Sequence, residues 1–348
     1  MTQSGLREKD RTVLRTIVEI YLQSGCPVSS GLIHGRKTLN DSPATIRNIM
    51  VKLEEMGYLT QPHASAGRVP TDLGLRFYVN TLLVDGPRGG EEPEIAMEGL
   101  ASRRGDLNAL LDGASRLLAD GSDSVGFVLS PRVSRINFQH LRFVQIGEAK
   151  VMVILVTTFN MVLTEIVAVE TDFTQPELDR ASQYINQNFA GKSLASVRDY
   201  LLRDLPRAKS QFDQAFGRLM SLLKSSVTQE EKEPPIFVQG ASRLIDKFDE
   251  ADMTVLKTLL KSFEEKANLA KLLSDFIALD RVKVLIGAEA NVPEIADCSL
   301  ILSHYGDAHQ VLGSLGIIGP KRLPYQKIIP LVDHVATKLS RTITRKPS

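Results

Sequence analysis

The stretch SPATIRNIMVKLEEMGYLTQPHASAGRVPTDLGLRFYVN, residues 42–80, decides how the N-terminal part of the chain folds. Ser42 is a favourable N-cap, Pro43 suits the first turn of a helix, and Gly57 is a common residue just beyond a helix end. Apolar side chains recur between them at helical spacing. The stretch therefore predicts a helix over residues 44–56.

Two short strands and another helix are predicted immediately afterwards. Residues 58–60 and 68–70 have the composition of strands and flank residues 63–67, which form a small, polar loop. Thr71 or Asp72 then caps a helix that carries further apolar side chains. The pattern predicts a hairpin between two helices.

Two more helices are predicted upstream. Apolar side chains at helical spacing predict the first over residues 10–22, and a serine N-cap begins the second over residues 30–37. Gly31 costs the second helix stability, because glycine loses more backbone freedom on folding than other residues do. Three helices, a hairpin and a fourth helix within residues 1–85 are typical of a winged helix-turn-helix module.

The helix predicted over residues 44–56 has an apolar side and a polar side. Its apolar positions are Ile46, Ile49, Met50 and Leu53. When these point inward, Ala44 and Asn48 point outward, with Arg47 beside them. Asn48 can bond adenine, Arg47 can bond guanine or a phosphate, and Ala44 can contact a thymine methyl group. Many exposed helices carry such residues, so the hairpin that follows is part of the argument.

The hairpin loop supplies a second set of polar side chains. His63, Ser65 and Arg68 stand among small residues without an apolar anchor, as in a wing that follows a phosphate backbone or a minor groove. The helix N-terminus at Ser42 favours phosphate. The predicted DNA-contacting residues are Ser42, Ala44, Thr45, Arg47, Asn48, Lys52, His63, Ser65, Arg68 and Thr71. Double-stranded DNA is the expected partner.

The rest of the chain alternates between helical and strand patterns. Residues 86–93, GPRGGEEP, have the composition of a linker. Helices are predicted over residues 94–120, 175–189, 194–204, 212–227, 253–279 and 325–343. Strands are predicted over residues 125–129, 141–146, 150–157, 162–169, 236–238, 282–287, 299–303 and 311–318. The three runs between residues 141 and 169 fit an antiparallel meander.

Composition and charge limit the class of protein. The 348 residues are enough for two or three domains, and 43% hydrophobic with 24% charged residues is typical of a globular chain. The net charge of +1 neither requires nor excludes a nucleic-acid partner. The sequence has no apolar run of membrane-spanning length and no signal-peptide pattern, and its two cysteines lie far apart. A cytoplasmic protein without a membrane partner is expected.

Patterns for catalysis, metals and cofactors are weak. The six histidines form no metal-binding motif, and the spacing of His304 and His309 does not suit helical ligands. Gly313, Gly316 and Gly319 are better explained by turns and close strand packing than by a phosphate cradle. No GxSxG motif is present. The sequence predicts no enzyme activity, no cofactor and no metal.

Residues 42–80 also resemble, at nearly every position, the N-terminal signature of the heat-inducible transcription repressors called HrcA. The resemblance continues to the C-terminus, where GSLGIIGPKRLPYQKIIPLVDHVATKL, residues 313–339, is similar to the family's closing strand and helix. The family usually has a Gly-Ser-basic sequence after the Pro-Val turn, whereas this chain has Ser29, Ser30 and Gly31. This departure argues against a phosphate contact from position 31.

The resemblance implies a negative regulator of chaperonin and chaperone operons. Such a repressor binds an inverted-repeat operator, called CIRCE, as a homodimer, prevents heat-shock induction at normal temperature, and depends on a GroEL-type chaperonin. The implied fold class is α+β and multidomain. Its parts are a winged helix-turn-helix over residues 1–85, a GAF-like domain over 94–140 and 227–348, and an inserted α/β dimerisation domain over 141–226.

Two other hypotheses compete with this one. A metabolite-responsive winged-helix repressor is the alternative, in which the strands over residues 282–287 and 299–303 and the helix over 253–279 enclose a ligand pocket of the GAF-like domain. A hydrolytic or transfer enzyme with an accessory DNA-binding module is the third hypothesis. No sequence feature favours that third hypothesis.

Overall fold

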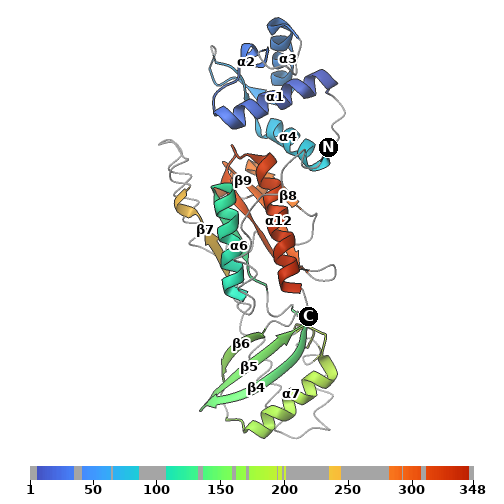
Figure 1. Ribbon diagram of the computed structural model, residues 1–348, viewed down its shortest axis with the longest axis vertical. Coiled ribbons are helices and arrows are strands. Elements are labelled where there is room, and N and C mark those ends of the chain that lie inside the picture. The colour runs from blue at the N-terminus through green and yellow to red at the C-terminus, as the bar shows by residue number, and fades with distance from the viewer. Residues whose placement is uncertain are drawn as a thin grey trace.

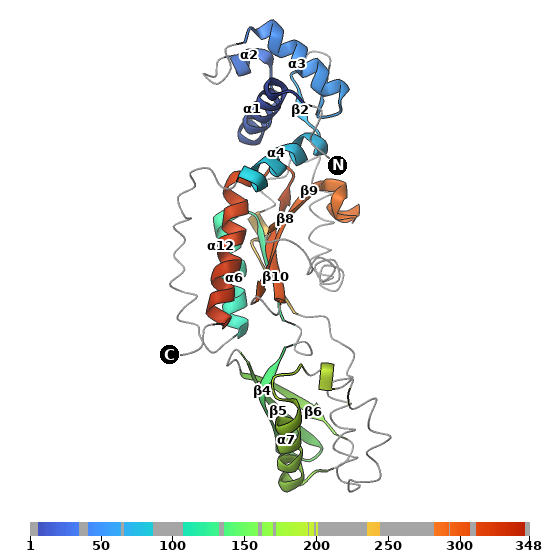
Figure 2. The ribbon, with the colours of Figure 1, turned by 90° about the vertical axis from the view of Figure 1, so that its right-hand side faces the viewer.

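Helices and strands are mixed in three tiers along the long axis of the molecule (Figure 1). The computed structural model describes residues 6–34, 41–63, 66–85, 107–131, 136–158, 162–169, 172–193, 195–197, 200, 235–243, 282–291, 293–306 and 311–344. The N-terminal helices occupy one end, a larger sheet lies in the middle, and a smaller sheet occupies the other end (Figure 1, Figure 2). None of the described helices is long and apolar enough to cross a bilayer.

The N-terminal tier contains the elements predicted from the sequence. They are α1 (Glu8–Ser24), α2 (Ser30–His34), α3 (Pro43–Glu55), β1 (Leu59–Thr60), β2 (Val69–Pro70) and α4 (Asp72–Asp85). β1 and β2 pair antiparallel, and an isolated bridge between Val28 and Arg68 adds a third segment to the hairpin. Apolar side chains of α1, α3 and α4 share one core.

α3 forms where its cap and its apolar stripe predict it. The Ser42 hydroxyl accepts a hydrogen bond from the Thr45 backbone N–H at 3.3 Å. Ile46, Met50 and Leu53 are buried on the inner face of the helix. Full burial of one such side chain stabilises a fold by roughly 1.5–3 kcal/mol. The inner face therefore holds α3 in the core while its outer face stays in solvent.

The middle tier is an antiparallel sheet covered on one face by two helices. Its described strands are β3 (Val125–Leu129), β7 (Ile236–Gln239), β8 (Val282–Ile286), β9 (Cys298–Gly306) and β10 (Val311–Pro320), in the order β7-β3-β10-β9-β8. α6 (Leu107–Ser122) and α12 (Tyr325–Thr344) lie side by side on that face (Figure 2). Gly126 lets α6 approach β3, because a Cβ there would lie 2.3 Å from the Ser115 carbonyl oxygen.

The third tier is a smaller antiparallel sheet with its own core. Its described strands are β4 (Phe138–Gly147), β5 (Lys150–Thr157) and β6 (Val162–Ala168), in that order. α7 (Gln175–Phe189) packs beside β4. The buried Phe138, Phe143, Leu178 and Ile185 belong to a hydrophobic cluster that is distinct from the core of the other two tiers.

Polar side chains of α7 close the outer edge of β4. Asn186 accepts a hydrogen bond from the Leu141 N–H at 2.8 Å and donates one to the Leu141 carbonyl at 2.9 Å. The Ser182 hydroxyl accepts from the Phe143 N–H at 3.0 Å, and Gln175 donates to the Phe143 carbonyl at 3.1 Å. A strand edge leaves such backbone groups unpaired unless another element satisfies them. α7 is therefore joined to β4 mainly by neutral hydrogen bonds, beside one exposed ion pair between Arg142 and Asp179 at 4.0 Å.

Some predicted element bounds needed correction. β4 begins at Phe138 rather than at residue 141, because Phe138 pairs with Thr157 of β5. β9 extends beyond the predicted residues 299–303 at both ends, because it pairs with β10 along its whole length. The predictions that lie outside the described residues are the linker 86–93, the helices over 212–227 and 253–279, the beginning of the helix over 94–120, most of 194–204 and the end of 30–37.

Candidate nucleic-acid interface

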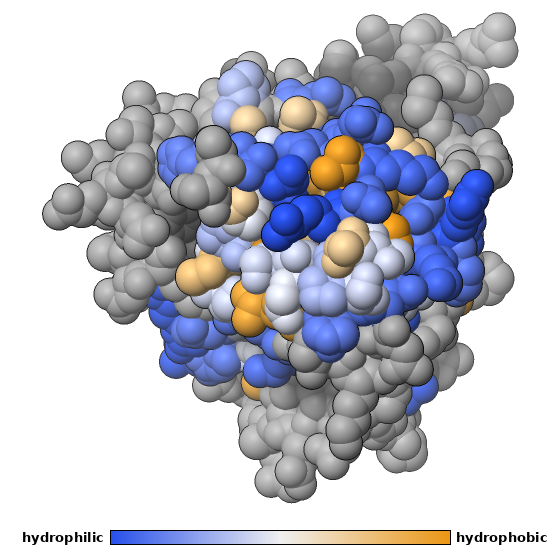
Figure 3. Space-filling view, turned by 90° about the horizontal axis from the view of Figure 1, so that it is seen from above, coloured by the Kyte–Doolittle hydropathy of each residue, from blue (hydrophilic) through white to orange (hydrophobic). Residues whose placement is uncertain are grey.

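The N-terminal half of α3 presents a polar face to solvent. Ala44, Thr45, Arg47 and Asn48 are all exposed. The side chains of Arg47 and Asn48 make no hydrogen bond or ion pair with any residue that the structure describes. Viewed from this end of the molecule, the described surface is mainly hydrophilic, with small separate hydrophobic areas (Figure 3). Exposed polar side chains that are not engaged in the fold are suited to reading base edges.

Ser42 and Thr45 shape the start of this face. The two hydroxyl oxygens lie 3.0 Å apart, and the Ser42 hydroxyl also caps the helix. Both residues are exposed. The first turn of a helix attracts anions because its N–H groups point outward along the helix dipole. A phosphate can therefore approach the first turn of α3.

Lys52, predicted to contact DNA, has a different role in the structure. Its ammonium group pairs with the carboxylate of Asp10, whose side chain is only 6% exposed. A carboxylate with so little access to water needs a partner, because an unpaired buried charge is strongly destabilising. The ion pair therefore joins α3 to α1, while the Lys52 side chain stays 41% exposed.

Arg68, also predicted to contact DNA, makes an ion pair within the fold. Its guanidinium pairs with Glu54 of α3 at 2.8 Å, and its side chain is 16% exposed. Its backbone exchanges hydrogen bonds of 2.8 and 2.9 Å with Val28. Arg68 thus holds the hairpin against α3.

The remaining predicted hairpin residues differ in their surroundings. The Thr71 hydroxyl donates to the Gly57 carbonyl at 2.7 Å and accepts from the Gly74 N–H at 3.2 Å, so it caps α4. His63 is exposed next to the loop, whereas Ser65 lies outside the described residues.

Asp10 and Glu54 are the residues of this region that sequence reasoning missed. Asp10 precedes Val13, Leu14 and Ile17 by three, four and seven residues and therefore lies on the apolar stripe of α1. An acidic residue on such a stripe signals a buried ion pair, since charged side chains are rarely buried unless paired. No comparable pattern marks Glu54.

Burial also perturbs one tyrosine of α4. Loss of solvent raises the pKa of the Tyr78 phenol to about 12, and the nearby Glu19 carboxylate adds to the increase. Tyr78 is 3% exposed. The uncharged phenol belongs to the core that α1 and α4 share, and it is not available as a surface acid.

The other motifs of the sequence do not form a second site in the described part of the chain. No three His, Cys, Asp or Glu side chains come together there as metal ligands. His304 is on β9, whereas His309 lies outside the described residues. A Cβ on Gly316 would lie 2.2 Å from the Ile301 carbonyl oxygen, which confirms close strand packing at this glycine.

Comparisons with known proteins agree over nearly the full chain. The sequence model of the HrcA protein C-terminal domain matches residues 108–329. A heat-inducible transcription repressor HrcA from Geobacter sulfurreducens is 36% identical over 340 residues, covering 98% of this chain and 99% of that protein. Another from Xanthomonas euvesicatoria pv. vesicatoria is 37% identical over 334 residues, covering 96% and 95%. The crystal structure of a hypothetical protein has the same fold, with a TM-score of 0.64 at 23% identity, covering 98% of this chain and 99% of its own. The chain belongs to the HrcA family of heat-inducible transcription repressors.

Proposed function

We propose that this protein represses heat-shock operons by binding double-stranded DNA through α3. The observation that carries the proposal is the exposed polar half of α3, in which the Arg47 and Asn48 side chains are unpaired, in a chain of the HrcA family. Arg47 and Asn48 contact base edges, and small neighbours let the helix approach the major groove. The proposed DNA-contacting residues are Ser42, Ala44, Thr45, Arg47, Asn48, His63 and Ser65.

The proposed domain organisation follows the three tiers. Residues 1–85 are a winged helix-turn-helix domain, 94–140 with 227–348 are a GAF-like domain, and 141–226 are an inserted dimerisation domain. The separate hydrophobic core of the third tier supports an insertion, and the start of β4 at Phe138 favours a limit slightly before residue 141. A homodimer presents two copies of α3 to an inverted repeat, because twofold symmetry in the protein matches twofold symmetry in the operator.

The proposed operator is of the CIRCE type, upstream of chaperonin and chaperone operons, and bound repressor excludes polymerase from it. The proposed second partner is a GroEL-type chaperonin that keeps the repressor in its DNA-binding form. Family membership supports both partners. The metabolite-responsive alternative relies on the helix over residues 253–279, which lies outside the described residues.

A gel-shift titration on a CIRCE-type duplex and on a scrambled duplex, with and without chaperonin, tests the proposal. At about 150 mM salt, we expect a preference of about 10³ or more for the inverted repeat, and chaperonin should strengthen binding. Equal affinity for both duplexes under both conditions would contradict operator recognition. An operator preference that chaperonin does not change would remove only the chaperonin from the proposal.

Asn48→Ala tests the reading face directly. Loss of a bidentate base contact should weaken operator binding by roughly 1–3 kcal/mol and relax the sequence preference. Asn188→Ala is the matched control, because it makes the same change on an exposed position of α7. If both variants bind like the wild type, Asn48 does not read a base.

The salt dependence of binding separates Arg47 from Arg68. A side chain that neutralises a phosphate contributes about one unit to the slope of log affinity against log salt. Arg68→Ala should leave this slope unchanged, since Arg68 is already paired with Glu54. If Arg47 contacts a phosphate rather than a guanine, Arg47→Ala should reduce the slope by about one. A reduced slope for Arg68→Ala would restore Arg68 as a phosphate contact.

A further inference from the structure

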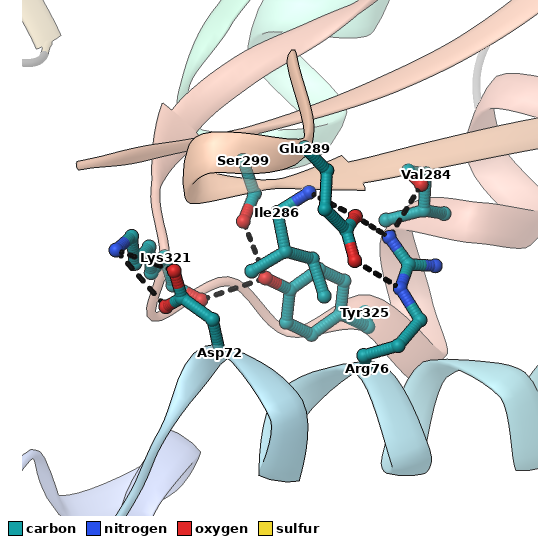
Figure 4. Close-up of polar contacts among 8 residues, drawn as sticks. All are labelled: Asp72, Arg76, Val284, Ile286, Glu289, Ser299, Lys321 and Tyr325. Atoms are coloured by element: carbon teal, nitrogen blue, oxygen red, sulfur yellow. Dashed lines mark hydrogen bonds and ion pairs between the residues drawn. The ribbon is translucent and has the colours of Figure 1, made fainter. Parts of the chain in front are cut away.

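α4 meets the middle tier at a charged junction at one end of the central sheet (Figure 4). α4 contributes Asp72 and Arg76. The turn after β8, η4 (Gly287–Ala290), contributes Glu289, and Lys321 follows the last residue of β10. We call Asp72, Arg76, Glu289 and Lys321 the α4 junction.

The first half of the α4 junction is a bidentate ion pair. Arg76 Nε donates to Glu289 Oε1 at 2.7 Å, and Arg76 Nη2 pairs with Glu289 Oε2. The same Nη2 also donates to the Val284 carbonyl at 2.7 Å, and Glu289 Oε2 accepts from the Ile286 N–H at 2.8 Å. The planar guanidinium fits this arrangement in one orientation only. The contact therefore specifies the angle of α4 as well as its distance from the sheet.

The second half of the α4 junction is anchored in the core. Lys321 Nζ lies 2.9 Å from Asp72 Oδ1 and 3.8 Å from Asp297 Oδ1. The Tyr325 hydroxyl donates to the Lys321 carbonyl at 2.8 Å and lies 2.6 Å from the Ser299 hydroxyl. Tyr325 is fully buried, and burial raises the pKa of its phenol, so the group keeps its proton and remains a donor. The backbone that carries Lys321 is thereby held in place.

Gly287 makes the close approach of α4 possible. Its φ of +56° lies in the left-handed region, which glycine adopts without strain. A Cβ at this position would lie 2.4 Å from Asp72 Oδ2 and 2.8 Å from Lys321 Cε. A larger residue at position 287 would be strained at this φ and would displace the Asp72 and Lys321 side chains, and so would disturb their ion pair.

α4 in turn contacts the segment that directly follows α3. The Thr71 N–H donates to the Tyr58 carbonyl at 3.1 Å, and the Thr71 hydroxyl donates to the Gly57 carbonyl directly after α3. The rings of Tyr58 and Phe77 also meet edge to face, with centroids 6.1 Å apart. The orientation of α4 on the sheet therefore sets the orientation of α3.

The exposure of the α4 junction indicates what it contributes. The side chains of Asp72, Arg76, Glu289 and Lys321 are 43%, 22%, 36% and 28% exposed. Ion pairs this accessible to water add little to the stability of a fold. Their directional hydrogen bonds can still select one orientation between two packed regions, since interfaces between domains are small, polar and mobile by default.

We propose that Asp72 and Arg76 are positioning residues that fix the separation of the two α3 helices in the dimer, and thereby the half-site spacing that the repressor accepts. This inference rests on the proposed function. A rigid junction presents both helices at one distance and orientation, so a single spacing of the two half-sites fits them. A released junction lets each N-terminal tier rotate, so several spacings fit. Each is bound with lower affinity, because the N-terminal tiers are then ordered only on binding, at a cost in free energy.

The test measures affinity for a series of inverted repeats whose half-sites are moved apart one base pair at a time, together with a duplex that carries a single half-site. Wild type should prefer one spacing. Arg76→Ala should lose about tenfold in affinity at that spacing and bind the whole series more evenly, and its affinity for the single half-site should equal that of wild type. Arg76→Lys keeps the charge without the planar fork and should fall between the two.

Gly287→Ala perturbs the α4 junction at its sheet side and leaves all four ion-pairing side chains in the sequence. It should flatten the spacing preference as Arg76→Ala does. Gly191→Ala is the matched control, because Gly191 also has positive φ, at +84°, but a Cβ there meets nothing within 4 Å. Far-ultraviolet circular dichroism verifies that every variant is folded.

The outcomes separate the inference from the proposed function. If wild type shows no preference for any inverted repeat, the proposed function fails. If wild type prefers one spacing and the Arg76 and Gly287 variants keep the same preference, the positioning role is overturned. A loss of equal size at every spacing and on the single half-site also overturns it, because that result indicates damage to α3 itself.

Discussion

α7 and α4 each pack against a sheet, but the chemistry of their contacts differs. α7 contributes Leu178 and Ile185 to a buried core and closes the β4 edge with neutral groups such as Asn186. α4 meets the end of the central sheet through the charged, partly exposed α4 junction, in which Arg76 pairs with Glu289. α7 is held by burial and by neutral hydrogen bonds, whereas α4, which also belongs to a hydrophobic cluster that extends into the middle tier, is oriented on the central sheet by ion pairs.

The difference indicates which contact can open without unfolding the protein. Separation of α7 from β4 would expose apolar surface and leave backbone groups of an edge strand unpaired, and both changes are costly. Opening of the α4 junction exchanges ion pairs for hydrated charges, at a cost of about 0–1 kcal/mol per exposed pair. The ion pairs of the α4 junction can therefore rearrange at lower cost than the contacts of α7, while the hydrophobic cluster that extends from α4 into the middle tier stays packed.

The largest expected effect comes from the core under α7. Leu178 is 0% exposed, so Leu178→Ala should lower the free energy of unfolding by about 2–5 kcal/mol through lost burial and an unfilled cavity. Leu73→Ala on α4 is the matched control, because Leu73 is 48% exposed and its truncation should change stability by about 0.5 kcal/mol or less. Urea titration measures both values. Equal losses would contradict the distinction between the two helices.

An intermediate effect is expected from the polar closure of β4. Asn186→Ala removes both hydrogen bonds to Leu141 and should destabilise the third tier by roughly 1–3 kcal/mol, because backbone groups lose their partner. Asn188→Ala on the same helix serves as control, since the Asn188 side chain donates a hydrogen bond to the Tyr184 carbonyl within α7 itself and not to β4. If Asn186→Ala is neutral in urea titration, water replaces the amide at this edge.

The smallest effect on stability, and the only salt-dependent one, is expected at the α4 junction. Arg76→Ala should change the free energy of unfolding by about 1 kcal/mol or less. The change should shrink further at about 1 M sodium chloride, where the Debye length is about 3 Å. Urea, which is uncharged, is the suitable denaturant for this comparison. A large loss that salt does not affect would mean that Arg76 stabilises the fold in the same way as the α7 contacts do.

Much of the N-terminal tier could be predicted from local sequence. The cap at Ser42, the proline at the first helical position and the stripe of Ile46, Met50 and Leu53 specify α3, and the structure confirms its bounds to within one residue. α7 and β5 also follow the predicted bounds. These elements are short-range features, since capping and periodicity involve residues only a few positions apart.

Contacts between distant parts of the chain decide which side chains of the predicted interface remain available. Lys52 pairs with a residue 42 positions away and Arg68 with one 14 positions away, so periodicity alone could not distinguish them from Arg47. The α4 junction joins Arg76 to Glu289, 213 residues later. The sequence by itself determined the helices, the hairpin and the polar face of α3, because local spacing specifies them. Only the tertiary structure decided which charges are neutralised within the fold and how α3 is oriented, because ion pairs depend on distances that folding creates.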